Sequence, residues 1–194
     1  MEEKTISTSY GMIRSWNERD VDTLVKYANN RNVWINMRDG FPHPYTEESA
    51  RAFLELVSRQ DPVTFYAIAT PQEAIGGIGV TLNADVHRLT AEMGYWLGEP
   101  YWRKGIMTET VTRFTDYVFE EFGLVRVYAE PYAGNLSSCR VLEKAGYALE
   151  GRLRCSVIKN GQIIDQLMYA KIKQSPPSDS MTIRGRLDPY RGER

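Results

Sequence analysis

The chain is poor in the residues that build metal centres and disulfide frameworks. It has two cysteines, Cys139 and Cys155, and two histidines, His43 and His87. Two cysteines cannot form a disulfide framework, and these two lack the spacing of paired metal ligands. Because the histidines fall in unrelated loops, a His-rich metal site is not expected. The composition therefore predicts no metal and a reducing, cytoplasmic compartment.

Long apolar runs and an excess of charge are also missing. No stretch approaches the roughly 20 apolar residues that cross a bilayer. The start of the chain, Met1-Glu2-Glu3-Lys4, lacks the basic-then-apolar layout of a signal peptide. A net charge of −1 argues against general nucleic-acid binding through long-range attraction. We therefore expect neither a membrane nor a nucleic acid as a partner.

What remains is an ordinary globular composition, with 194 residues of which 42% are hydrophobic. That length favours one domain, which we place at residues 1–173. From the Ser175-Pro176-Pro177-Ser178 segment onward there is no apolar period. Residues 174–194 are therefore predicted to be a loosely attached or disordered tail.

Hydrophobic periodicity and capping residues predict a mixed α/β (α+β) fold. Strands are expected near 6–16 and at 65–69, 75–82, 89–97, 125–130, 153–158 and 163–171. The last two are joined by Asn160-Gly161, a strong hairpin signal. Helices are expected at 21–29 with Asp20 as cap, at 47–59 with Thr46 as cap, at 106–122, and from Asn135 to Gly146. This order predicts a single, mostly antiparallel sheet flanked by helices, with a strand–helix–strand unit at its centre.

The segment AEMGYWLGEPYWRKGIMTET, residues 91–110, carries the most chemical information. A strand is stopped by Pro100, and a turn through Gly105 leads into the long helix. A helix N-terminus offers unpaired amides and a positive dipole end, and glycine lets those amides surround a phosphate. Arg103 and Lys104 add positive charge there. The alternative is an ordinary helix start with solvated basic residues, since the pattern is neither a P-loop nor a dinucleotide fingerprint.

Two motifs resemble the GNAT superfamily of N-acetyltransferases. Residues 102–107, WRKGIM, align with its R/Q-x-x-G-x-G/A loop for acetyl-CoA, with Trp102 and Met107 at the two atypical positions. Met107 leaves the backbone amides available but is expected to crowd the cofactor. Residues 94–97, GYWL, and 135–147, NLSSCRVLEKAGY, are similar to the branch of ribosomal-protein N-terminal acetyltransferases. The resemblance covers roughly residues 6–173.

This resemblance implies an acetyl-CoA-dependent N-acetyltransferase with the GNAT-like sheet. It implies cofactor contacts from Trp96, Leu97, Arg103, Lys104, Gly105, Ile106, Met107, Thr108, Asn135 and Ser138. For Asn135 the simpler interpretation is a helix cap.

Two residues are candidates for catalysis. Glu92 lies on the strand where many GNAT enzymes carry a catalytic glutamate, and the alternative is a solvent-facing strand residue. The family's usual tyrosine acid is replaced by Leu142, so we expect Ser138 to hydrogen-bond the leaving sulfur, unless it is merely an exposed hydroxyl. A backbone N–H near Trp96–Leu97 is expected to meet the carbonyl oxygen, and Gly94 is compatible with a β-bulge there.

The acceptor is predicted to be the α-amine of a protein or peptide. About a tenth or more of an α-amine is neutral near pH 7, against about one in two thousand for a lysine amine. Phe41 and Tyr45, in a proline-stiffened loop, are expected to line the acceptor channel or simply to pack on the sheet. A small amine such as a polyamine, amino sugar or amino acid is the alternative acceptor. A non-catalytic acyl-CoA-binding module and a homodimer remain open.

Overall fold

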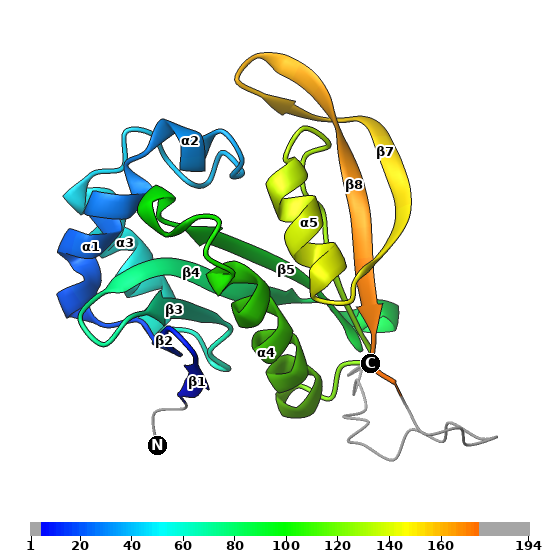
Figure 1. Ribbon diagram of the computed structural model, residues 1–194, viewed down its shortest axis with the longest axis horizontal. Coiled ribbons are helices and arrows are strands. Elements are labelled where there is room, and N and C mark those ends of the chain that lie inside the picture. The colour runs from blue at the N-terminus through cyan, green and yellow to red at the C-terminus, as the bar shows by residue number, and fades with distance from the viewer. Residues whose placement is uncertain (1–4, 175–194) are drawn as a thin grey trace, which may run out of the picture.

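The computed structural model describes residues 5–174, which form one sheet with the strand order β1-β2-β3-β4-β5-β6-β8-β7 (Figure 1). The strands are β1 (Ile6–Thr8), β2 (Gly11–Ser15), β3 (Phe65–Ala69), β4 (Ala74–Leu82), β5 (Thr90–Leu97), β6 (Arg126–Ala129), β7 (Ala148–Lys159) and β8 (Gln162–Ile172). The α-helices are α1 (Val21–Ala28), α2 (Arg31–Trp34), α3 (Glu47–Ser58), α4 (Ile106–Glu121) and α5 (Leu136–Lys144). Apart from Gln174, the predicted tail lies outside the described residues.

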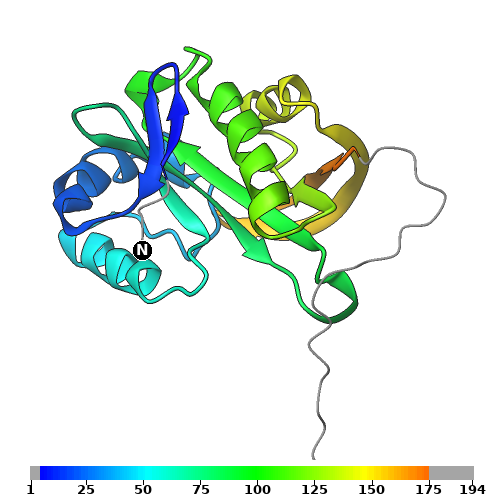
Figure 2. The same cartoon turned by 90° about the horizontal axis from the view of Figure 1, so that it is seen from below.

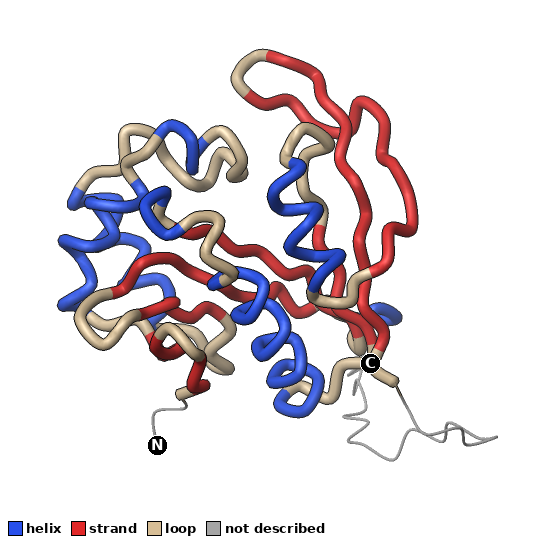
Figure 3. Tube along the Cα trace, in the orientation of Figure 1, coloured by secondary structure: helices blue, strands red, loops and turns tan. Residues whose placement is uncertain are grey.

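The sheet is antiparallel at every rung except between β5 and β6, which are parallel and joined by α4. This confirms the predicted fold class and its central strand–helix–strand unit. Figure 2 shows α1 and α3 on one side of the sheet and α4 and α5 on the other. The segment between α2 and α3, drawn as loop in Figure 3, faces the tip of the β7–β8 hairpin.

Each face of the sheet has its own core because side chains alternate along the strands. The α4 and α5 face is the larger, built around Phe114, Val111 and Val118 of α4 and Met93 of β5. The α1 and α3 face is smaller and contains Val21, Leu24, Ala28, Tyr45, Ala50, Leu54 and Val57. β5 contributes to both faces, so any site built on it is held from two sides.

Several details differ from the sequence predictions. The first predicted strand is a β1–β2 hairpin broken at Ser9-Tyr10, and α2 was not predicted. Asp20 does not cap α1 with its side chain. Its carboxylate instead accepts two hydrogen bonds of 2.7 Å from Arg14 and one of 3.0 Å from the Asn17 amide. Gly94 makes no bulge, because the β4–β5 register is continuous from Gly76↔Leu97 to Leu82↔Ala91.

Candidate active site

The parallel strands β5 and β6 separate after three rungs, and this split positions the candidate site. They pair only at Thr90↔Arg126, Ala91↔Val127 and Glu92↔Tyr128, although β5 continues to Leu97. In an antiparallel ladder alternate residues turn their N–H groups away from the partner strand. Beyond Glu92, alternate residues of β5 therefore direct backbone amides into the gap. A Cβ added at Gly94 would meet nothing within 4 Å, so the face of β5 that carries Glu92 and Trp96 is uncovered at this point.

The loop after β5 ends at Gly105, the N-cap of α4. Gly105 has φ +81°, in the left-handed region that favours glycine, and no side chain of the described residues caps the helix. The first-turn amides of α4 are therefore free to bind an anion. Arg103 and Lys104 are exposed beside them. The Tyr10 hydroxyl donates to the Lys104 carbonyl, so the β1–β2 turn supports this loop from outside.

The two atypical residues of the loop have structural roles. Trp102 donates its indole N–H to the Leu97 carbonyl at 2.7 Å, which ties the loop to the end of β5. Met107 is 8% exposed and packs in the larger core with Ile106. Its side chain points into the protein, and this burial counts against the expectation that Met107 crowds the cofactor. Thr108 remains half-buried in the same turn.

Aromatic side chains form a wall on the α1 and α3 side of β5. The ring of Phe41 lies edge-on to that of Trp96, with centroids 5.7 Å apart, and is 5.0 Å from that of Tyr45. Trp96 fits because β4 has glycine opposite it: a Cβ at Gly77 would lie 2.8 Å from the indole nitrogen. Tyr45 is 4% exposed, and burial raises its pKa to about 12. Tyr45 thus packs in the core, and Phe41 is the better placed of the predicted acceptor contacts.

Glu92 lies on the same face of β5 as Trp96 and is half-buried rather than solvent-facing. Its carboxylate accepts a hydrogen bond from Arg38, and the same guanidinium nitrogen lies 3.8 Å from a carboxylate oxygen of Glu130. Burial raises the pKa of Glu92, Arg38 opposes that shift, and Glu130 adds to it. A carboxyl group with a raised pKa is a candidate for proton transfer. Glu130 and Arg38 were not predicted as site residues, because nothing in their spacing indicates that they meet.

The opposite face of β5 carries Tyr95, whose hydroxyl oxygen lies 2.8 Å from that of Ser138 on α5. Burial strongly raises the pKa of Tyr95, so its phenol stays protonated. Asn135 accepts a hydrogen bond from the Ser138 amide at 3.1 Å. It is therefore the N-cap of α5, which confirms the simpler of the two sequence interpretations. Ser138 is therefore held by its backbone through Asn135 and by its side chain through Tyr95.

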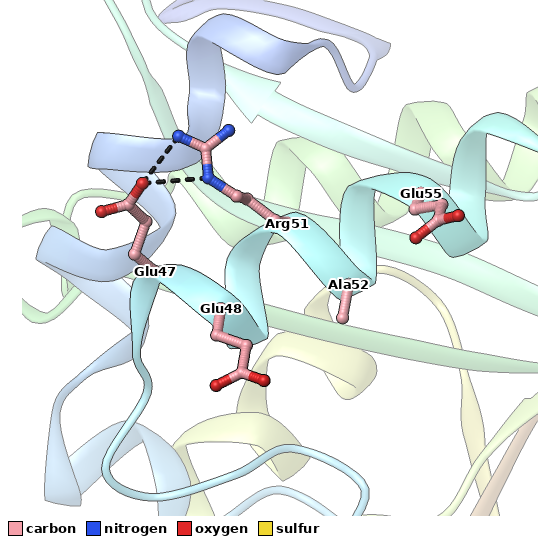
Figure 4. A pocket seen from close by; sticks show the side chains of 5 residues that line it. All are labelled: Glu47, Glu48, Arg51, Ala52 and Glu55. Atoms are coloured by element: carbon pink, nitrogen blue, oxygen red, sulfur yellow. Dashed lines mark hydrogen bonds and ion pairs between the residues drawn. The ribbon is translucent and has the colours of Figure 1, made fainter.

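A cavity of about 260 Å³ lies between residues of the loop after α2, of the segment after β6 and of the β7–β8 hairpin, and Glu92 adjoins it through its ion pair with Arg38. Its lining includes Arg38, Glu130, Tyr132, Val157, Ile158 and Gln166. A larger hollow of about 520 Å³ runs along the exposed side of α3 (Figure 4). All its lining residues belong to that one helix, and Figure 4 shows Arg51 turned toward Glu47. Because α3 lies far from α5 and the hairpin in Figure 1, we place the chemistry at the smaller cavity.

Comparison with known proteins decides the family. Residues 12–148 match the acetyltransferase (GNAT) domain family. The chain belongs to the GNAT acetyltransferases. It is 36% identical over 102 residues to the uncharacterized N-acetyltransferase YoaA of Bacillus subtilis, a match that covers 53% of this chain and 57% of YoaA. It is 28% identical to the uncharacterized N-acetyltransferase p20 of Bacillus licheniformis, over 88% of this chain and 97% of p20.

The solved structures that this acetyltransferase resembles include RimL, the ribosomal L7/L12 α-N-protein acetyltransferase, in complex with coenzyme A. The TM-score is 0.77 at 21% identity, covering 87% of this chain and 98% of that chain. At this identity the likeness concerns the fold.

Acetyl-CoA is the acetyl donor of this family, and the residues present fit it. The uncapped first turn of α4 with its left-handed glycine suits the pyrophosphate, and the split between β5 and β6 suits an extended arm. Among residues 5–174, no group of His, Cys, Asp or Glu side chains could hold a metal ion. Within the same range, no helix is long and apolar enough to span a bilayer.

Proposed function

We propose that this acetyltransferase modifies the N-terminal α-amine of a protein or peptide. The similarity to RimL, whose name gives a protein α-amine as acceptor, supports this class. The observation that carries the proposal is the small number of charges at the cavity. Glu130 lines the cavity, Glu92 adjoins it through Arg38, and Asp39 is already paired with Lys159 at 2.9 Å. A polyamine would need several free carboxylates, whereas the N-terminus of a peptide needs a binding site for one ammonium group.

The geometry supports an assignment of residues to acetyl-CoA. The amides of Ile106, Met107 and Thr108 and the side chains of Arg103 and Lys104 would bind its phosphates. The arm would pass through the gap between β5 and β6, where a backbone N–H near Leu97 would bind the thioester carbonyl oxygen. When bound, the cosubstrate supplies an acetyl group on a thiolate leaving group.

The chain then needs to move two protons, one on each face of β5. On the Trp96 face, Glu92 takes the proton from the acceptor ammonium, directly or through water, and leaves a neutral amine. The amine nitrogen forms a bond to the carbonyl carbon as the carbon–sulfur bond breaks. On the other face, the Ser138 hydroxyl donates a hydrogen bond to the departing thiolate. The amine nitrogen releases its second proton as the amide forms, and the thiolate takes up one proton to become the thiol of coenzyme A.

The test compares kcat/KM across acceptors. Short peptides with free N-termini should be acetylated, whereas the same peptides blocked at the N-terminus but carrying lysine should be poor substrates. Polyamines, amino sugars and free amino acids complete the panel. Turnover of a small amine with no turnover of any free peptide or ribosomal protein would move the enzyme to the small-amine class. Absence of turnover with every acceptor, despite binding of acetyl-CoA, would indicate a binding module.

A further inference from the structure

The Arg38 guanidinium lies where a substrate cation would be expected. A single terminal nitrogen of Arg38 contacts Glu92 and lies 3.8 Å from Glu130. The two carboxylates are about one-fifth exposed, at 21% and 19%, whereas the Arg38 side chain is 67% exposed. A nitrogen between two half-buried carboxylates has the surroundings that an alkylammonium group needs.

The loop that carries Arg38 is held on both sides of it. The Tyr132 hydroxyl donates to the Met37 carbonyl at 3.1 Å. Asp39 pairs at 2.9 Å with Lys159, whose side chain is 2% exposed and whose ammonium lies 4.0 Å from the centroid of the Trp34 ring. The backbone at Arg38 is therefore fixed to β7 and to the segment after β6, while its long side chain is free to turn into solvent.

Glu130 is held more firmly than Arg38. Gln166 donates to its backbone carbonyl at 3.2 Å and to its carboxylate at 3.3 Å. Gln166 is itself buried and accepts a hydrogen bond of 3.0 Å from Ser156. If Arg38 turned away, Glu130 and Glu92 would stay in place and leave two half-buried negative charges side by side. An entering cation would relieve that cost.

We propose that Glu92 and Glu130 together form the seat of the acceptor's ammonium group, and that Arg38 occupies this seat until an acceptor displaces it. The assignment gives Glu130 a role in acceptor specificity and makes Arg38 an internal competitor. It rests on the proposed function only in that the acceptor is a cationic amine, whether it belongs to a peptide or to a small molecule.

The experiment measures binding to the intact chain by calorimetry, with coenzyme A present. The probes are peptides that begin with Ala or Ser, the same peptides N-acetylated, butylamine and its neutral amide N-butylacetamide. Arg38→Ala should tighten binding of the amines about fivefold, the upper range of a partly exposed ion pair, and leave the neutral amides unchanged. Glu130→Gln should weaken amine binding roughly tenfold and abolish the gain from Arg38→Ala in the double variant. Arg59→Ala, which removes a comparably exposed arginine from the Glu55 pair, is the matched control.

The outcomes separate this proposal from the proposed function. Unchanged or weaker amine binding in Arg38→Ala overturns it, as does an equal gain for the neutral amides. Thermal unfolding checks that each variant is folded, and Arg38→Met provides a second variant that keeps the length of the side chain. If no peptide binds but butylamine responds as described, the proposed peptide acceptor is wrong, whereas the ammonium site at Glu92 and Glu130 is supported.

Discussion

The Tyr95 phenol and the Ser138 hydroxyl lie 2.8 Å apart across the boundary between β5 and α5. If Tyr95 donates this bond, the Ser138 hydrogen is free to point at a sulfur in the gap. Ser138→Ala should lower kcat about tenfold, and Tyr95→Phe should lower it less, because the serine is kept but no longer oriented. The double variant should match Ser138→Ala alone. Rapid-quench kinetics of the acetyl transfer step measures this, and additive losses would show that the two residues do not act together.

Glu92→Gln should lower kcat and remove the lower-pH break in the profile of kcat/KM. Burial raises the pKa of Glu92, so this break should lie above the ordinary glutamate range. Because Arg38 holds the pKa down and Glu130 raises it, Arg38→Ala should move the break to higher pH and Glu130→Gln to lower pH. A break that follows the amine's own pKa when the acceptor is exchanged belongs to the acceptor. Such a result would remove Glu92 from proton transfer.

Local sequence patterns predict the elements of the proposed cofactor half of the site, but not the side chains that meet in the proposed acceptor half. The strand, glycine and helix of the phosphate loop are consecutive, and the Asn135 cap acts within its own helix turn, so propensity and pattern locate both. The contact between Arg38 and Glu130 joins residues far apart in sequence, and no spacing rule reaches that distance. Tyr95 could have been predicted from the sequence. Side chains alternate along a strand, so Tyr95 lies on the face opposite to Glu92 and Trp96, which is the face that α5 and Ser138 cover.

The Arg14–Asp20 pair is expected to contribute to stability, because the Asp20 side chain is 5% exposed and accepts from both Arg14 and the Asn17 amide. Asp20→Asn would leave Arg14 partly buried beside a neutral group, and should lower the free energy of unfolding by about 2–4 kcal/mol. Urea unfolding provides the measurement. Glu55→Gln, which breaks an exposed pair with Arg59, should change stability by less than about 0.5 kcal/mol. Equal effects of the two substitutions would contradict the assignment.

Gly105 and Gly123 bracket α4, and both have positive φ, at +81° and +61°. An added Cβ would lie 3.8 Å from the nearest atom at Gly105 and would have none within 4 Å at Gly123, so neither substitution causes a clash. Valine at either position should therefore lower stability by about 1–2 kcal/mol through backbone strain alone. The two variants therefore match in strain and differ in place. Gly105→Val should weaken coenzyme A binding at least tenfold by obstructing phosphate approach to the first-turn amides, whereas Gly123→Val should leave it unchanged. Calorimetry on both folded variants decides the matter, because equal affinities would place the phosphates somewhere other than the start of α4.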